Sequence, residues 1–213
     1  MAGKDAVDRL TGLLEGASFR EELQRVAQGA DLLTLGLLDA DNFKELNDTH
    51  GHAAGDALLT AVGQRLKALA EQAGGVAGRI GGDEFAVVLP GVSLESGFLQ
   101  MERFRAGVTA VEGLVPEVPG YRPSISIGVA NYPRDVKSAG DLLARADQAL
   151  WQAKEAGRNQ VALPTVEEMV MKTCYYTTAQ IGRLKRLAEK RSVTESSLLR
   201  EALDDLLRKH DVK

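Results

Sequence analysis

Apolar and polar positions along the chain form blocks that predict alternating helices and strands. Apolar residues at helical spacing predict helices over 19–30, 55–72, about 93–112 and 138–159. Mostly apolar runs predict strands over 31–41 and 124–132, and "GRIGGDEFAVVLP" (78–90) predicts a hairpin. Because helices alternate with strands and one hairpin interrupts them, we expect a mixed α/β (α+β) fold with helices flanking a sheet that is not strictly parallel.

The pattern changes near 162–169, where Pro164 is the only punctuation. We therefore expect two domains, 1–163 and 164–213. The second reads as a strand over 169–176 followed by helices over 177–191 and 192–210. Fewer than 50 residues in this arrangement bury little core alone, which predicts that the second domain is a dimer.

Composition narrows the class of protein. With 213 residues, 44% apolar and 26% charged, the chain is expected to be soluble and globular. No apolar run reaches the roughly 20 residues that span a bilayer, and the N-terminus lacks a signal-peptide core, so we expect a cytoplasmic protein without a membrane partner. A single cysteine, Cys174, excludes an internal disulfide framework. The net charge of −4 hides a mildly basic tail, which alone says little about nucleic acid.

Acidic residues gather where two predicted strands end. Asp39 closes one strand, and Asp83 and Glu84 follow the pair Gly81 and Gly82 in the hairpin. If the strands are neighbours, these carboxylates meet at one sheet edge and suit magnesium, while a glycine pair suits a tight turn with positive φ that a nucleotide can approach closely. The alternative is an ordinary hairpin with a polar tip.

Basic residues are available to hold phosphates. Lys44 follows Asp39 within about one turn of helix. Lys154 and Arg158 are four residues apart, which places them on one face of the predicted 138–159 helix. Taken singly, each of these three could equally be a solvated surface residue.

Five motifs occur in order with consistent spacing. They are "DRLTGL" (8–13), "DADNFKELNDTHGHAAGDALL" (39–59), "GRIGGDEFAVVLPG" (78–91), "SISIGVA" (124–130) and "ADQALWQAKEAGRN" (146–159). Together they resemble the GGDEF family of diguanylate cyclases. The resemblance implies a palm-like fold with a central, mostly antiparallel sheet. It also implies condensation of two GTP molecules into cyclic di-GMP with Mg²⁺ or Mn²⁺, two ions per active site.

By position, the resemblance assigns roles to individual residues. It implies that metal binding and catalysis are carried out by Asp39, Asp83 and Glu84, with the Ala40 carbonyl as a further metal ligand. It implies that the triphosphate is bound by Lys44, Lys154 and Arg158. The nucleotide is implied to approach closely at Gly81 and Gly82, and guanine to be recognised by Asn47 and Asp56. A carboxylate accepts from guanine N1–H and the 2-amino group, and an unpaired contact with adenine costs about 1–3 kcal/mol. Asp56 is alternatively an N-cap of the 55–72 helix, and both roles stay open.

The chain departs from the family pattern at three places. Glu15 and Gly16 stand where an Asn-Arg pair is usual, and the stretch from Leu10 to Asp39 is short, which implies a trimmed first helix. "QAGG" (72–75) replaces the Arg-x-x-Asp product-inhibition motif, so we expect no tight product feedback through that site. The motifs begin within the first ten residues, so no sensory domain is expected before them.

The tail resembles the ribbon-helix-helix family of DNA-binding proteins over about 40 residues, "MKTCYYTTAQIGRLKRLAEKRSVTESSLLREALDDLLRK". The resemblance implies that two chains pair their strands and interlock their helices. The strand face implied to meet the major groove carries Met171, Thr173 and Tyr175, and the amide of Thr194 would meet a phosphate. Two interpretations stay open: the tail dimerises the chain and binds double-stranded DNA, or it dimerises the chain only.

Two functions of different classes remain at this point. The first is a diguanylate cyclase that acts on GTP as a homodimer held by its tail. The second is a transcription regulator whose cyclase-like domain senses GTP or cyclic di-GMP with little turnover. The absent Asn-Arg pair favours the regulator. The enzyme is favoured by the metal and phosphate residues, which are Asp39, Lys44, Asp83, Glu84 and Lys154.

Overall fold

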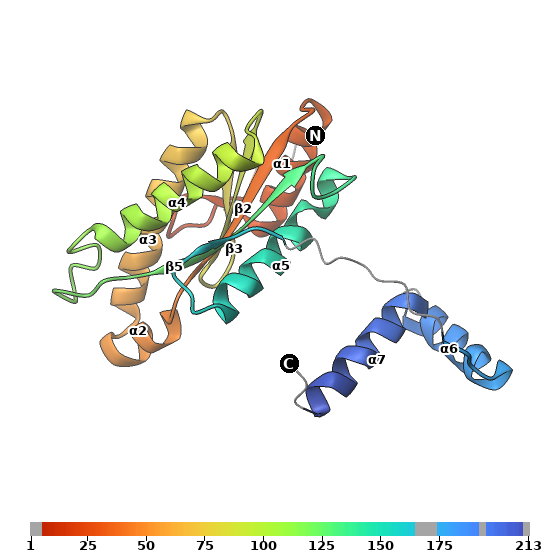
Figure 1. The fold of residues 1–213 in the computed structure, drawn as a ribbon. Coiled ribbons are helices and arrows are strands. Elements are labelled where there is room, and N and C mark those ends of the chain that lie inside the picture. The colour runs from red at the N-terminus through yellow and green to blue at the C-terminus, as the bar shows by residue number, and fades with distance from the viewer. Residues whose placement is uncertain (1–5, 165–173, 192–194, 211–213) are drawn as a thin grey trace. The chain divides into compact units, whose positions relative to one another are not determined.

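The structure is a computed structural model that describes residues 6–164, 174–191 and 195–210. The chain divides into two compact units, Met1–Val166 and Glu167–Lys213 (Figure 1). Within the described ranges no helix is both long and apolar enough to cross a membrane.

A six-stranded sheet with the order β1-β3-β4-β2-β5-β6 forms the centre of the first unit. The strands are β1 Leu14–Glu15, β2 Leu33–Ala40, β3 Val76–Gly81, β4 Glu84–Pro90, β5 Ile125–Tyr132 and β6 Val161–Ala162. The four inner strands pair antiparallel, and the two short outer strands pair parallel with their neighbours. The predicted mixed, mostly antiparallel sheet is therefore confirmed.

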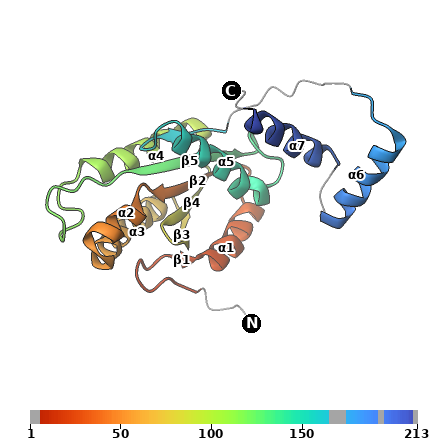
Figure 2. The same ribbon diagram turned by 90° about the horizontal axis from the view of Figure 1, so that it is seen from below.

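Helices cover both faces of this sheet (Figures 1 and 2). The helices of the first unit are α1 Gly16–Gln28, α2 Phe43–His50, α3 His52–Gln72, α4 Leu94–Ala110, the short 3-10 turn Ala139–Asp141 and α5 Leu142–Glu155. One core packs α3 and α4 against the sheet, and the other packs α1 and α5 against its opposite face. Because β2 is buried on both faces, all eight of its residues are buried.

Period-two alternation divides the strand residues between the two cores. In β4, Phe85 and Val87 face the α3/α4 core, whereas Ala86 and Val88 face the α1/α5 core. On β5, Gly128 leaves room for α5, because a side chain there would collide with the backbone of Ala146 and Leu150. This close approach fixes α5, which carries Lys154, against the sheet.

The last predicted helix of this unit extends too far. The sequence indicated a helix over 138–159, but α5 ends at Glu155. Gly157 then adopts φ 110°, and both Arg158 and Asn159 have positive φ. A helix cannot continue through left-handed backbone, so Arg158 lies in a turn beyond α5 and not on its face with Lys154.

The described residues of the second unit, 174–191 and 195–210, form two helices, α6 Thr178–Arg191 and α7 Glu195–Lys209. Both match the predicted positions to within a few residues. Residues 174–176, the end of the predicted strand, are not in a strand in this single chain, and 169–173 lie outside the described residues. A ribbon strand needs a partner strand for its hydrogen bonds, so a single chain is not expected to form one.

Candidate active site

The predicted acidic residues lie at adjacent strand ends. β2 and β4 are antiparallel neighbours, and their register places Asp39 directly opposite Glu84. Just beyond this pair, the Ala40 amide donates to the carbonyl oxygen of Asp83 at 3.2 Å. Asp39, Asp83 and Glu84 therefore share one end of the sheet, as the sequence had suggested.

Asp39 is largely buried and forms an ion pair with Lys154 from α5. Asp39 is 8% exposed, and Lys154 Nζ lies 2.7 Å from Asp39 Oδ2. Burial raises the pKa of Asp39, and the nearby charges of Asp83 and Glu84 raise it further, while Lys154 acts in the opposite direction. The net effect is a raised pKa of Asp39, because the attraction of Lys154 only partly offsets the cost of burying the ionised carboxylate.

The donor set fits a metal ion that the substrate helps to bind. In the described part of the chain, no three His, Cys, Asp or Glu side chains form a ready-made metal cluster. Magnesium commonly takes only one or two protein carboxylates and completes its shell with phosphate oxygens and water. The buried Asp39 carboxylate, opposite a second acid in the register, matches that requirement, so the residues present fit Mg²⁺ or Mn²⁺ bound together with a nucleotide.

The hairpin glycines leave its surface bare. A Cβ added at Gly81 or Gly82 would meet no atom within 4 Å, so both face open space. Gly82 has φ 49°, which favours glycine, whereas Gly81 does not have positive φ, so the sequence interpretation holds for only one of the pair. A ligand could approach this backbone without meeting side chains.

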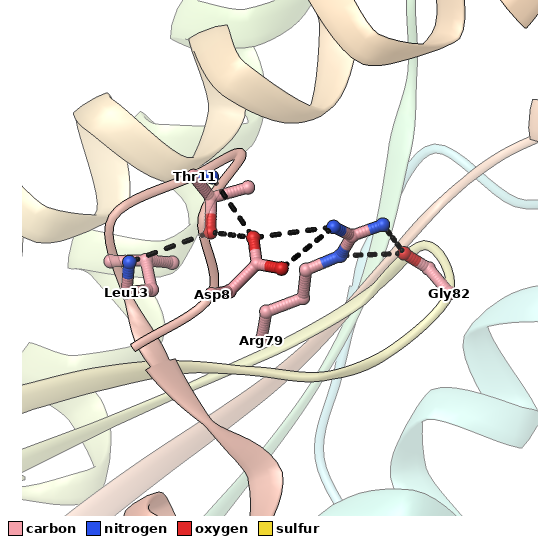
Figure 3. A network of polar contacts seen from close by, with 5 residues as sticks. All are labelled: Asp8, Thr11, Leu13, Arg79 and Gly82. Carbon is pink, nitrogen blue, oxygen red and sulfur yellow. Dashed lines mark hydrogen bonds and ion pairs between the residues drawn. The ribbon is translucent and has the colours of Figure 1, made fainter. Parts of the chain in front are cut away.

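An ion pair that sequence reasoning missed links the N-terminal segment to the hairpin through Asp8 and Arg79 (Figure 3). Both carboxylate oxygens of Asp8 accept from Arg79 Nη1 at 3.2 Å, and Asp8 also accepts from the amide and hydroxyl of Thr11. Arg79 in turn donates to the Gly82 carbonyl from Nε and Nη2, at 2.9 and 2.7 Å. The only sequence signal was the Asp-x-x-Thr spacing within "DRLTGL".

The predicted guanine-reading residues lie on α2 and α3. Asn47 has a side-chain oxygen that is buried without a hydrogen-bond partner, and a side chain at Gly55 would collide with it. Asp56 is exposed and lies inside α3, which begins at His52 with Gly51 as its N-cap. The N-cap alternative for Asp56 is therefore wrong, and its carboxylate stays available to a ligand.

The remaining predicted site residues are only partly within the described structure. Lys44 lies exposed in the first turn of α2, and Arg158 is exposed in the turn after α5. Of the residues expected to meet DNA, Tyr175 is 99% exposed, whereas Met171, Thr173 and Thr194 lie outside the described residues.

The raised pKa of Asp39 predicts that Asp39→Asn stabilises the protein. The folded state binds this proton more tightly than the unfolded chain, so wild-type stability falls as pH rises from about 4 through the raised pKa. Without Mg²⁺ or nucleotide, the variant is expected to melt at a higher temperature than the wild type at pH 7.5. The difference should vanish as pH approaches about 4, as measured by thermal unfolding across pH.

Asp8→Asn is the matched control with the opposite sign. Burial raises the pKa of Asp8, but the hydrogen bonds from Thr11 and Arg79 outweigh it and leave the pKa lowered. The ionised carboxylate therefore stabilises the fold above about pH 4. This variant should melt lower than the wild type at pH 7.5, with a deficit that shrinks in acid. If Asp39→Asn also melted lower at pH 7.5, the attraction of Lys154 would outweigh burial.

Family models match both units of the chain. Residues 5–160 match the model described as "Diguanylate cyclase, GGDEF domain", and residues 172–211 match the model described as "Ribbon-helix-helix domain". The second match spans the whole of α6 and α7.

Similar proteins come from several bacteria. YhcK of Bacillus subtilis is 37% identical over 166 residues, which are 76% of this chain and 46% of that protein. The diguanylate cyclase DgcP of Pseudomonas aeruginosa is 41% identical over 164 residues, which are 74% of this chain and 24% of that protein. The chain thus corresponds to less than half of the length of either relative.

A solved structure shares the fold of the first unit. The GGDEF domain of DgcB from Caulobacter crescentus, in complex with c-di-GMP, superposes with a TM-score of 0.68 at 30% identity and covers 77% of this chain and 96% of that one. The first family model spans well over half of the 213 residues. This chain therefore belongs to the GGDEF family of diguanylate cyclase domains, and its GGDEF domain is followed by a ribbon-helix-helix domain.

Proposed function

We propose that the protein is a diguanylate cyclase that converts two GTP molecules into cyclic di-GMP and two pyrophosphates. The observation that carries this proposal is the register of β2 and β4, which sets Asp39 opposite Glu84. Lys154 Nζ lies 2.7 Å from Asp39 Oδ2, and the neighbouring hairpin has two glycines without side chains around them. An acidic pair, an adjacent lysine and an open backbone are the parts that phosphoryl transfer to a hydroxyl requires.

In this reaction the 3′-hydroxyl of one GTP attacks the α-phosphorus of another. A bond forms between O3′ and the α-phosphorus, the bond from the α-phosphorus to the bridging oxygen breaks, and pyrophosphate leaves; repeating the step closes the ring. Bound divalent ions would lower the pKa of the hydroxyl and neutralise the leaving group. We assign the triphosphate to Lys44, Lys154 and Arg158, and the metal ligands to Asp39, Asp83, Glu84 and the Ala40 carbonyl.

We assign base selection to Asn47 and Asp56. The exposed Asp56 carboxylate can accept from guanine N1–H and the 2-amino group, neither of which adenine offers. The side-chain oxygen of Asn47 lies against Gly55 and is buried without a hydrogen-bond partner, so it can accept a hydrogen bond from a ligand that reaches it. ATP is accordingly expected to be a poor substrate.

Each reaction needs two nucleotide sites that face each other, and we propose that the tail brings the second one. Within the second unit, large apolar side chains remain exposed on α6 and α7: Ile181, Leu187, Leu199, Leu203, Leu206 and Leu207. So small a unit cannot bury them alone, and a second copy offers the same two amphipathic helices. The occupant of this apolar surface is therefore a second copy of the chain.

A second candidate is a nucleotide-sensing regulator that binds double-stranded DNA through the tail. Two features favour it: the basic residues of α6, which are Arg183, Lys185, Arg186, Lys190 and Arg191, and the replacement of the usual Asn-Arg pair by Glu15 and Gly16. Gly16 lies against the β3 backbone, where an added Cβ would be 2.8 Å from the Ile80 carbonyl.

Incubation of the purified chain with GTP and Mg²⁺ distinguishes the two candidates. The cyclase is expected to release two pyrophosphates for each cyclic di-GMP, with ATP in place of GTP as the control. A protein that binds a GTP analogue but forms no cyclic di-GMP, and whose shift of duplex DNA changes with nucleotide, would instead be the regulator.

A further inference from the structure

Asp41 is a buried carboxylate that the proposed reaction does not use. It lies just beyond β2 and is only 3% exposed. Three donors meet it: Ser126 Oγ at 2.7 Å on Oδ1, and Ser124 Oγ at 2.8 Å and the Asn159 amide at 3.0 Å on Oδ2. Its own amide donates to the Ser124 carbonyl at 3.0 Å. Asp41 thus joins the ends of β2 and β5 to the turn after α5.

That turn has an unfavourable backbone and therefore needs support. Arg158 and Asn159 have φ of 64° and 46°, a left-handed region that residues with a Cβ rarely adopt. The Arg158 amide donates to the Ala153 carbonyl at 3.0 Å, which closes the end of α5. The side-chain oxygen of Asn159 accepts from Arg105 Nη1 at 2.9 Å, and the backbone amide of Asn159 donates to Asp41. The Asp41 contact ties the turn to the end of the sheet that carries Asp39, and the next residue, Gln160, is tied to β5 through its carbonyl, which accepts from the Ile127 amide at 2.9 Å.

We propose that Asp41 is a positioning residue that holds the turn at 158–159, and so the Arg158 guanidinium, at the substrate end of the sheet. This inference rests on the proposed function, because it takes Arg158 to bind the triphosphate. In the described part of the chain, Arg158 is exposed and its side chain has no hydrogen bond or ion pair of its own. The backbone beneath it therefore sets where the cation lies, and Asp41 is the buried carboxylate among the groups that hold this backbone.

The chemistry of the three donors separates alanine from asparagine at this position. Alanine leaves the Asn159 amide without its acceptor. Asparagine can keep its oxygen toward Ser124 and Asn159 if its NH₂ faces Ser126, whose hydroxyl can rotate and accept. Asp41→Asn should therefore retain much of the turn that Asp41→Ala loses.

A double-mutant cycle with Arg158→Ala tests whether Asp41 acts through Arg158. Loss of one charge-assisted hydrogen bond predicts that Arg158→Ala raises the KM for GTP about 10-fold or more. Asp41→Ala is expected to raise it by a similar factor, and Asp41→Asn by about 3-fold or less. The double variant Asp41→Ala/Arg158→Ala should be within about 2-fold of Arg158→Ala alone, because the same contact is lost once. A KM that rises by the product of the two single effects would overturn the inference.

Thr34→Val is the matched control for a purely structural effect. Thr34 lies on the same two-strand pair at its other end, where Asn131 donates to its hydroxyl at 2.9 Å and the hydroxyl donates to the Val92 carbonyl at 2.7 Å. This variant should lower the melting temperature while leaving the KM for GTP within about 2-fold of the wild type. An equal rise in KM for Thr34→Val would assign the Asp41 effect to general destabilisation. If Asp41→Ala does not fold, the cycle with Asp41→Asn decides: its small KM effect must disappear in the Arg158→Ala background.

The same cycle is measured on the dissociation constant of a non-hydrolysable GTP analogue with Mg²⁺. This second readout does not depend on turnover. Coupled binding without cyclic di-GMP formation would overturn the proposed function alone, whereas cyclic di-GMP formation with independent effects of Asp41 and Arg158 would overturn this inference alone.

Discussion

Asp83→Ala protein is expected to form cyclic di-GMP about 10³-fold more slowly than the wild type, since removing a single charge-stabilising group from an active site commonly costs that much. Asp83 follows Gly82 in the hairpin, and its carbonyl accepts from the Ala40 amide next to Asp39. Its charge acts on Asp39, and in the proposed reaction its carboxylate would help to hold the counter-ions of the reacting phosphate. The measurement is the initial rate of cyclic di-GMP formation at saturating GTP and Mg²⁺.

Two comparisons separate this chemical effect from unfolding. The negative charge of Asp83 raises the pKa of Asp39, so removing it relieves repulsion, and the variant should melt no lower than the wild type at pH 7.5. Glu112→Ala removes an exposed carboxylate whose partner is Arg122 on the surface, and it should leave the rate unchanged. An Asp83→Ala rate within 10-fold of the wild type would mean that the acidic hairpin is not the reaction centre.

The sequence was sufficient for features set by local periodicity. The apolar run before Asp39 and the glycine pair before Asp83 each fixed one strand end, and acids at neighbouring strand ends could be anticipated to meet. The register itself sets Asp39 opposite Glu84, 45 positions away along the chain. It depends on how the two strands align along their length, and only the structure gives it.

The errors came partly from contacts between distant residues and partly from the exact ends of helices. The predicted helix over 138–159 extended too far, because α5 ends at Glu155, just before Gly157, the stop signal that the sequence offers. The left-handed turn beyond it includes a contact of the Asn159 backbone amide with Asp41, 118 positions away, which local pattern cannot reveal. The Asp8–Arg79 pair spans 71 positions and was missed for the same reason. Asp56 was given a capping alternative because α3 was predicted to begin near Gly55, whereas it begins at His52.

These corrections change how the site is understood. Lys154 and Arg158 do not share a helix face: Lys154 is placed by α5 packing on Gly128, while Arg158 is placed by a turn that Asp41 holds. The two cations are therefore positioned by separate elements, so a change that shifts one need not shift the other. Both elements are held against the sheet whose β2 and β4 ends carry Asp39 and Glu84.

Leu203→Asp/Leu206→Asp protein is expected to be monomeric and to form cyclic di-GMP at least about 10²-fold more slowly per chain at low micromolar concentration. Both leucines lie on α7 and are 54% exposed in the single chain, within the apolar surface assigned to a second copy. A tethered pair of catalytic domains meets at an effective concentration of roughly millimolar, whereas separate chains meet only at their bulk concentration. Sedimentation velocity gives the oligomeric state, and the rate is measured over a range of protein concentrations.

The concentration dependence identifies the cause of the loss. The specific rate of the double variant should rise with protein concentration, and a fused inducible dimeriser should restore it, because the active site within each chain is intact. Leu99→Asp is the matched control: Leu99 is 55% exposed on α4 of the first unit, so the same substitution should change neither the oligomeric state nor the rate. A double variant that stays dimeric would show that the α7 surface is not the dimer interface. A monomeric variant with full activity at low concentration would show that the tail does not bring the two GTP sites together.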